Sequence, residues 1–295
     1  MNPLSGNCEL MNNPATANPE ADYTALVEEA RGIRLAVAEA LYSIPTGGHY
    51  GGCFSVVEIL LGLYRLAMRV EPAQPQSPDR DRLILSKGHS ALTLYAVLRQ
   101  IGYFSADLRE YADFAARLEG HPDMLALPGI DFSTGSLGQG LSVGAGMALA
   151  LRKTRIPVWV ILGDGECQEG QIWEAAMFAS VYHLDNLCVV VDSNGFQECG
   201  WSLVDTTSSP EPVPEMAAKW MAFGWNVISC DGHLFSDLAR SFSLVRSFAG
   251  KPSVILAKTK KGNGASYVEE RPHRFHCTAV SHAEHETIVR QIHPR

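Results

Sequence analysis

Residues 157–166 read PVWVILGDGE, and residues 187–194 read LCVVVDSN. Each stretch begins with a short apolar run, rich in Val and Ile, that ends at a polar or glycine-containing turn, which is typical of a buried strand in a parallel sheet. Residues 169–183 between them are rich in Ala, lack Pro and repeat apolar residues at helical spacing, so the segment predicts a strand, a helix and a second strand. In such units, ligands bind beyond the carboxyl ends of the strands.

The two turns that end these runs carry groups suited to a metal and a phosphate. Gly163 and Gly165 let the backbone approach a phosphate closely. Asp164 offers a carboxylate and Asn194 an amide oxygen, the hard ligands that Mg²⁺ or Ca²⁺ prefers. Either turn alone is equally typical of a loop that ends a strand. The pair, at this separation and between these runs, indicates a divalent metal that holds a diphosphate.

Size and charge bound the class of protein. The chain has 295 residues, is 46% hydrophobic and carries a formal net charge of -8. This length allows one large α/β domain, and the acidic balance argues against a nucleic-acid partner, which would require a basic surface. Apolar stretches are interrupted before membrane-spanning length, and the N-terminus lacks a hydrophobic signal, so we expect no membrane partner and a cytoplasmic location. The cysteines form no CxxC pair, so we expect reduced thiols.

The order of patterns along the chain predicts the fold class. Residues 1–20, rich in Asn and Pro, predict a flexible tail, and residues 21–295 predict a single domain. Strands are also expected at 83–85, 226–230 and 253–257, and helices at 23–43, 55–68, 90–101, 137–152, 214–223 and 234–249. The alternation indicates the α/β class, with a doubly wound, mostly parallel sheet and helices on both faces.

Histidines recur beside glycines in segments expected to be loops. His49, His89 and His121 each lie in such a segment, and His273 and His276 form a late pair. Histidine can donate to a phosphate or a hydroxyl and exchanges protons near neutral pH, which favours a reaction with repeated proton transfers. A zinc site is the competing hypothesis, but neither His-x₃-His nor His-Glu-x-x-His spacing occurs. For a single histidine, a loop or helix-cap role fits about equally well, but His49, His89 and His121 are stronger candidates because each ends a glycine-containing turn just before an expected helix or a proline.

A second glycine-rich loop, STGSLGQG at residues 133–140, precedes an expected helix. Its backbone N–H groups and hydroxyls could receive an anion or a polar ring at the helix N-terminus. A tight turn followed by a close helix crossing explains the same composition, so the loop alone is weak support for a ligand.

Taken together, these motifs resemble the N-terminal half of a transketolase. The segments GGHYGGCFSVVEILLGLY, SKGHSALTLYAVL, EGHPD, PGIDFSTGSLGQGLSVGAGMALA, GDGECQEGQIWEAAMFAS and DSNGFQ occur in the family's order, from about residue 30 to residue 276. The resemblance implies a thiamine-diphosphate-binding fold. It also implies that Asp164, Asn194 and the backbone carbonyl of Phe196 hold the Mg²⁺ or Ca²⁺ that bridges the diphosphate.

The same resemblance implies roles for further residues. His49, His89, His121 and His276 correspond to active-site histidines that bind the cofactor or the donor hydroxyls, with His276 near the diphosphate. Glu169 and Glu174 match acidic residues at a subunit interface; two exposed helix glutamates are the alternative. The implied cofactor-binding residues are Gly135, Leu137, Gly138, Gly163, Asp164, Gly165, Glu166, Asn194 and His276.

The chain also departs from the family pattern. Tyr50 follows His49 where a proline is usual, and Cys277 follows His276 where a glycine is common, which leaves the late position open between His273 and His276. A second domain, with the glutamate that protonates the aminopyrimidine, is missing. We therefore expect one subunit of a split, heterotetrameric transketolase, active only with a separate pyrimidine-binding (C-terminal) subunit that supplies the catalytic Glu.

The expected reaction moves a two-carbon ketol (glycolaldehyde) unit from a ketose donor to an aldehyde acceptor. Two alternatives remain: a thiamine-dependent 2-oxo acid decarboxylating or acyl-transferring synthase subunit, and a non-catalytic regulatory homologue. Retention of Asp164, Asn194 and the three early histidines argues against the second alternative.

Overall fold

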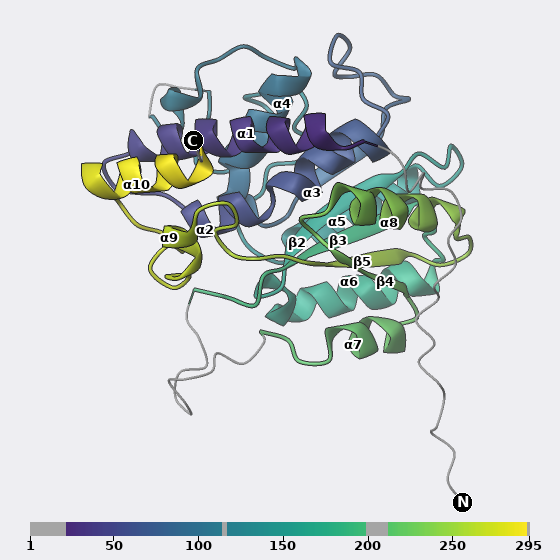
Figure 1. Ribbon diagram of the computed structural model, residues 1–295. Coiled ribbons are helices and arrows are strands. Elements are labelled where there is room, and N and C mark those ends of the chain that lie inside the picture. The colour runs from purple at the N-terminus through teal and green to yellow at the C-terminus, as the bar shows by residue number, and fades with distance from the viewer. Residues whose placement is uncertain (1–21, 114–116, 199–211, 294–295) are drawn as a thin grey trace, which may run out of the picture.

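The computed structural model describes residues 22–113, 117–198 and 212–293 (Figure 1). The expected flexible tail at residues 1–20 lies outside the described residues. Five strands form one sheet in the order β1-β2-β3-β5-β4, and all four pairings are parallel. The expected strands and the parallel sheet are therefore confirmed. The strands are β1 Arg82–Leu85, β2 Val158–Gly163, β3 Leu187–Ser193, β4 Asn226–Asp231 and β5 Ser253–Lys258.

Helices cover both faces of the sheet, as Figure 1 shows for α6 and α7 on one side and α3 and α8 on the other. Successive side chains of a strand point to opposite faces of the sheet. On β2, Val160 therefore packs on the side of α6 and α7. Its neighbour Trp159 packs edge-on against Phe242 of α8 on the other side, with ring centroids 5.7 Å apart. The first group comprises α5 Gln139–Ala150, α6 Gly170–Val181 and α7 Met216–Ala222. The second comprises α2 Tyr50–Ser55, α3 Val57–Gly62, α4 Ala91–Ile101 and α8 Phe235–Ser247.

Further elements complete the second side of the sheet. Helix α1 lies against α3, α4 and α10, and short helices connect the larger ones. The remaining elements are α1 Thr24–Tyr42, the π-helix η1 Leu63–Ala67, the 3₁₀ helices η2 Gly88–Ser90, η3 Leu108–Glu110 and η4 Glu166–Gln168, and helices α9 Ser266–Glu269 and α10 His282–Ile292.

Small residues bring α5 close to the sheet. A Cβ atom at Gly144 would lie 2.4 Å from a methyl of Val160 on β2, and one at Gly140 would lie 2.5 Å from the side chain of Ser86. Both contacts are too short for a real methyl group. Glycine is therefore required where α5 crosses the strands that carry the site.

Two helical expectations need correction. The helix expected from about residue 55 begins at Tyr50, restarts after Val56 and ends as η1; Gly51 and Gly52 have low helix propensity, but complete burial of Tyr50–Ser55 overrides it. His89, expected in a loop, lies in η2. Helix α10 was not expected, although Ser281 and Glu284 form a capping box at its start.

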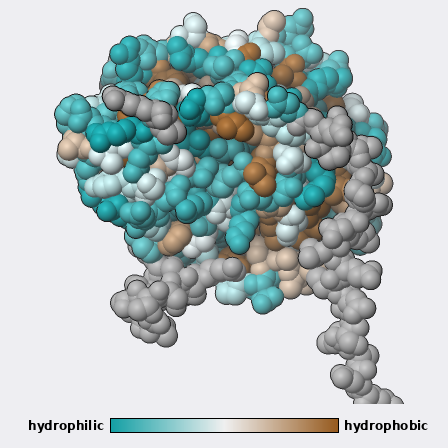
Figure 2. All heavy atoms as spheres, in the orientation of Figure 1, coloured by the Kyte–Doolittle hydropathy of each residue, from teal (hydrophilic) through white to brown (hydrophobic). Residues whose placement is uncertain are grey.

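The run Tyr50–Ala67 is long and apolar enough to cross a membrane by composition, but 83% of it is buried inside the fold, as in a core helix. The face of the molecule shown in Figure 2 is mostly hydrophilic, with hydrophobic residues in smaller patches.

Candidate functional site

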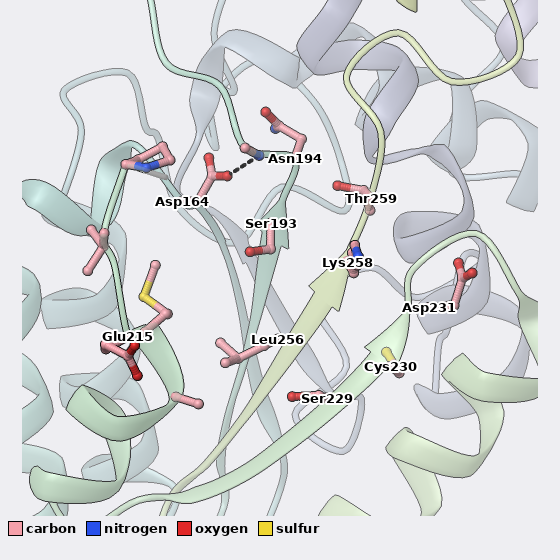
Figure 3. A pocket seen from close by; sticks show the side chains of 15 residues that line it. Asp164, Ser193, Asn194, Glu215, Ser229, Cys230, Asp231, Leu256, Lys258 and Thr259 are labelled. Carbon is pink, nitrogen blue, oxygen red and sulfur yellow. Dashed lines mark hydrogen bonds between the residues drawn. The ribbon is translucent and has the colours of Figure 1, made fainter. Parts of the chain in front are cut away.

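The site lies at the carboxyl ends of the strands, where the sequence patterns placed it. Gly163, the last residue of β2, pairs with Asp192 of β3, so the GDG and DSN turns lie side by side. Thr259, which follows β5, donates its backbone N–H to the carbonyl oxygen of Ser193, 3.1 Å away. Figure 3 shows Asp164, Ser193, Asn194 and Thr259 gathered at this edge of the sheet. Parallel pairing thus converts distant sequence positions into neighbours.

Asp164 is almost fully buried, with 3% of its surface exposed. Its carboxylate accepts backbone N–H bonds from Gly165, at 2.8 Å, and from Gly195, at 2.6 Å; the second is the dashed line in Figure 3. Burial, together with the negative charge of Asp192, raises the pKa of Asp164 to about 7. A carboxylate held in this way gains from a neighbouring cation, which restores its ionised form.

Asn194 is oriented by its neighbours. Its Nδ2 atom donates to Oδ2 of Asp192, 3.3 Å away, and its Oδ1 atom accepts the backbone N–H of Phe196 at 3.1 Å. A carboxylate, an amide oxygen and the carbonyl of Phe196 are a donor set that fits Mg²⁺ or Ca²⁺, and each oxygen keeps a free lone pair. No group of three or more His, Cys, Asp or Glu side chains suited to a metal ion occurs among residues 22–113, 117–198 and 212–293.

A buried ion pair between Lys87 and Asp192 supports the turn after β3. Lys87 donates from Nζ to Oδ2 of Asp192, 2.5 Å away, and to the carbonyl oxygen of Gly52 at 3.1 Å. Asp192 also accepts from Ser55, at 2.7 Å, and from Thr259. Burial alone would raise the pKa of Asp192, but Lys87 and these donors hold it below its usual value. Asp192 is therefore a fixed negative charge that directs the amide of Asn194.

A cavity of about 380 Å³ opens above the two turns. It brings together groups from the carboxyl ends of β1, β2, β3 and β5, including several residues expected to bind a cofactor. Its lining comprises Gly52, Lys87, His89, Leu137, Gly163, Asp164, Gly165, Glu166, Gln168, Glu169, Asn194, Phe196, Gln197, Glu198, Lys261 and His276.

Three of the expected histidines form a cluster at this cavity. The ring centroids of His49, His89 and His276 lie 5.2 to 5.7 Å apart. Burial, then the charges of His121, Lys87 and Lys261, lowers the pKa of His49 to about 4. Burial and Lys261 lower the pKa of His276 to about 3, and burial also lowers that of His89. The rings are neutral at pH 7 and can both donate and accept hydrogen bonds.

His121 and His273 lie outside the cluster. His121 is exposed, and a Cβ atom at Gly135 would lie 3.4 Å from its ring. His273 is also exposed, and its ring meets that of Phe196 edge-on with centroids 5.4 Å apart. His276, not His273, lines the cavity.

Lys261 was missed by sequence reasoning. Only 3% exposed, it places Nζ 3.1 Å from Nδ1 of His276 at the cavity wall. Burial, then repulsion from Lys87, lowers the pKa of Lys261 to about 8. Its position just beyond the expected fifth strand was the available signal, because ligands bind at carboxyl ends of strands.

Glu166 ties the second glycine loop to β2. It accepts hydrogen bonds from Ser86, at 2.5 Å, and from the backbone N–H groups of Gly138, at 2.8 Å, and Gly163, at 3.0 Å. Burial raises its pKa. Gly138 has φ +83°, and a Cβ there would lie 2.9 Å from the side chain of Glu169. Its neighbour Leu137 lines the cavity, so Glu166 fixes the wall that Leu137 presents.

Helix α6 leads away from the cavity with an exposed apolar surface. Glu169, at its start, and Glu174 are exposed. Met177 is 49% exposed, Phe178 38% and Val181 73%. We call Met177, Phe178 and Val181 the α6 apolar surface.

A second cavity of about 710 Å³ shares Asp164 and Asn194 with the first and extends over the ends of β4 and β5, past Lys258 and Asp231 (Figure 3). It is larger, but its lining includes none of the clustered histidines, whereas His89 and His276 line the first cavity.

Comparisons with known proteins identify the family of the chain. A family model described as "Transketolase, thiamine diphosphate binding domain" matches residues 27–292. The chain is 42% identical over 247 residues to the 6-deoxy-6-sulfo-D-fructose transketolase subunit SqwG of Clostridium sp. (strain MSTE9), which covers 83% of this chain and 88% of that protein. It is 37% identical over 265 residues to an apulose-4-phosphate transketolase subunit from Phocaeicola vulgatus, which covers 89% of this chain and 92% of that protein.

Among solved structures, the transketolase of Campylobacter jejuni superposes with a TM-score of 0.80 at 27% identity, covering 92% of this chain and 43% of that one. The chain thus spans most of the two relatives named as subunits, but less than half of that transketolase.

Proposed function

The chain belongs to the transketolase family, whose thiamine diphosphate binding domain it carries, and from this premise we propose that it is the diphosphate-binding subunit of a split, two-chain transketolase. Family membership makes it a thiamine-diphosphate-dependent transferase subunit. The cofactor, when bound, supplies the nucleophilic carbon that takes a two-carbon ketol unit from a ketose and delivers it to an aldehyde.

The observation that carries the proposal is the convergence of Asp164, Asn194 and Phe196 on one edge of the sheet, beside a cavity walled by neutral histidines. We propose that these three residues would hold a Mg²⁺ or Ca²⁺ through a carboxylate, an amide oxygen and a backbone carbonyl, and that this ion would offset the charge of the diphosphate. Of the two lysines that line the cavity, Lys261 would offset the charge of the diphosphate, because Lys87 is already paired with Asp192.

The histidine cluster serves hydrogen bonding and proton transfer. Because the pKa values of His49 and His276 lie at about 4 and about 3, the rings stay neutral at the pH of the cell. A neutral ring can accept a proton from a donor hydroxyl and return it, which a permanently charged group cannot do. We propose that His121, which is exposed beside Gly135 and outside the cavity lining, contacts the substrate. Leu137, Gly163, Gly165 and Glu166 line the cavity in which the cofactor would sit, and Gly135 and Gly138 belong to the same loop as Leu137.

A partner chain is implied by the relatives named as subunits. We propose that it is the pyrimidine-binding chain, which supplies the catalytic glutamate, and that two copies of each chain form a heterotetramer. We propose that the partner docks on the α6 apolar surface, together with Glu169 and Glu174 of the same region. This surface belongs to the helix that starts at the cavity, and a partner that completes the site must lie beside the cavity.

Two features concern the chain as a whole. We propose that residues 21–295 form a single diphosphate-binding domain, which one five-stranded sheet and a family match over residues 27–292 support. We also propose a cytoplasmic location, because the cytoplasm keeps cysteines reduced and is where sugars are metabolised.

The two relatives act, by name, on ketoses that bear a sulfonate or a phosphate. We propose a donor of the same class, a ketose with an anionic group. The test is a coupled assay of ketol transfer with this chain alone, with the co-purified partner alone, and with the two together. Transfer only by the pair supports the proposal. Full transfer by the isolated chain overturns it, and carbon dioxide release from a 2-oxo acid instead favours the synthase alternative.

A further inference from the structure

Lys261 reaches the cavity from a loop that an unusual contact holds in place. The backbone N–H of Lys260 donates to Nε2 of His233, 2.8 Å away, in the loop after β4. The Lys260 side chain turns outward to Glu269, 2.6 Å away, whereas that of Lys261 turns inward to His276. The two lysines begin one turn, which the backbone N–H of Asn263 closes by donating to the carbonyl oxygen of Lys260, 3.0 Å away. Fixing the peptide of Lys260 therefore also fixes the direction of Lys261.

This contact determines which nitrogen of His233 carries the proton. A backbone N–H can only donate, so Nε2 must be the unprotonated acceptor, and the ring proton sits on Nδ1. Nδ1 lies 3.0 Å from Oε2 of Glu58, on α3, and donates to it. The ring thus bridges a helix of the core and the loop that carries Lys261.

Glu58 is itself held rigidly. It is 6% exposed, and its other oxygen accepts from Arg34 of α1 at 2.5 Å. Burial alone would raise the pKa of Glu58, but Arg34 and His233 hold it below its usual value. On the far side of the loop, Gly264 has φ +90°, and a Cβ there would lie 2.7 Å from Arg34. Arg34 and Glu58 therefore form a fixed base against which His233 orients the loop.

We propose that His233 is a positioning residue that, through the backbone of Lys260, holds the ammonium of Lys261 against the diphosphate site. The proposal rests on the function proposed above, in which Lys261 neutralises the diphosphate. None of the contacts of His233 described here reaches the cavity, so its effect on the cofactor passes through Lys261.

The direct test follows Lys261 without any cofactor. The lysines of the ligand-free chain are ¹³C-methylated, the Lys261 signal is assigned from the spectrum of K261R, and its titration is followed by NMR. In the wild type, burial keeps the pKa of Lys261 at about 8. H233N keeps a donor for Glu58 but removes the acceptor for Lys260, so the Lys261 titration moves toward the ordinary value of 10.5. H233Q places an oxygen near the Nε2 position and restores the low value. An unchanged Lys261 titration in a folded H233N protein overturns the proposal.

A double-mutant cycle extends the test to the cofactor. In the complex with the partner, K261A lowers the affinity for Mg²⁺–thiamine diphosphate about 10-fold or more, as for loss of one charged hydrogen bond. H233N lowers it about 3- to 10-fold alone and has no further effect in the K261A background. Equal losses from H233N in both backgrounds contradict positioning. An unchanged affinity in K261A instead contradicts the proposed role of Lys261 at the diphosphate. In that case the NMR titration still decides whether His233 positions Lys261, because it is measured without cofactor. H183N, at an exposed histidine, is the control.

Discussion

The backbone N–H of Asp164 donates to the carbonyl oxygen of Asp192, 3.3 Å away, across the carboxyl ends of β2 and β3. This bond joins the two turns that carry the metal-ligand candidates. Asp192 holds the amide of Asn194, Lys87 holds Asp192, and Gly195 closes back onto Asp164. The site is therefore prearranged by contacts within this chain, although we propose that a partner completes it.

Replacing His276 should impair turnover more than cofactor binding. In H276Q we expect kcat/KM of the two-chain enzyme to fall by about 100-fold or more, because a proton-transfer group is lost, with a much smaller change in thiamine diphosphate affinity. Steady-state ketol transfer and equilibrium titration separate the two effects. H273Q and C277S are matched neighbours and should stay within a few-fold of wild type. A larger loss in H273Q than in H276Q would reassign the late histidine.

The clustered histidines give stability a definite pH dependence. Both His49 and His276 have pKa values lowered, to about 4 and about 3, from the ordinary 6.5. At a pH between the folded-state pKa and 6.5, the unfolded chain binds protons on these rings that the folded chain does not bind. The stability that the neutral rings contribute is therefore complete above pH 6.5 and is lost as the pH falls toward 4. We expect H276Q to reduce the drop in urea midpoint between pH 7 and pH 5 in the ligand-free chain.

H183Q is the control for this measurement, because His183 is exposed and lies outside the cavity lining. It should retain the wild-type drop. If H276Q and wild type lose stability equally over this range, the ring of His276 is not held neutral by burial.

Glu166 should be a strong determinant of stability. In E166Q, an amide replaces a carboxylate that accepts from Ser86, Gly138 and Gly163, so at least one buried donor faces another. We expect a loss of about 1–3 kcal/mol in the free energy of unfolding, measured by urea denaturation. E174Q, on the exposed face of α6, should change it by less than about 0.5 kcal/mol. A neutral E166Q would show that the loop 135–138 is not anchored through this side chain.

Charge on the α6 apolar surface should block assembly without unfolding the chain. Val181 is 73% exposed, so V181D costs little in the isolated chain but buries a charge in the proposed interface. Sedimentation of the mixed chains should show dissociation of the complex, while circular dichroism stays unchanged. L125D, at a residue 88% exposed and outside α6, should assemble normally. Wild-type assembly of V181D would place the interface elsewhere.

Strands β2, β3 and β5 were predictable because they are buried and read as short, nearly continuous apolar runs. All five strands were expected at their observed places, including β4, whose sequence NVISCD has only one buried residue. Asp164 and Asn194 were also predictable, because ligands bind beyond the carboxyl ends of parallel strands and each residue follows such a strand in the sequence. The start of α2 was not, because Gly51 and Gly52 disfavour a helix that burial then enforces.

Side chains that act through tertiary contacts were harder to identify, and for Lys261 the one signal was its place just beyond the expected fifth strand. Lys261 reads as an ordinary solvated lysine in the run KTKK, and only the fold shows it 3% exposed beside His276. The separation of His276 from His273 also depends on which ring the loop turns inward. Lys87 gave no signal, because its partner Asp192 lies on a strand that sequence order does not place beside it.

Binding of thiamine diphosphate to the complex of this chain with its partner, measured by calorimetry with Mg²⁺ and with EDTA, tests the assigned metal site most directly. We expect saturable binding with Mg²⁺ that is lost in EDTA and in D164A, because Asp164 supplies the only carboxylate of the proposed metal site. D107N, whose exposed carboxylate pairs with Arg109, should bind as wild type does. Wild-type affinity in D164A would contradict the assignment of Asp164 and Asn194 as the residues that hold the diphosphate through a metal.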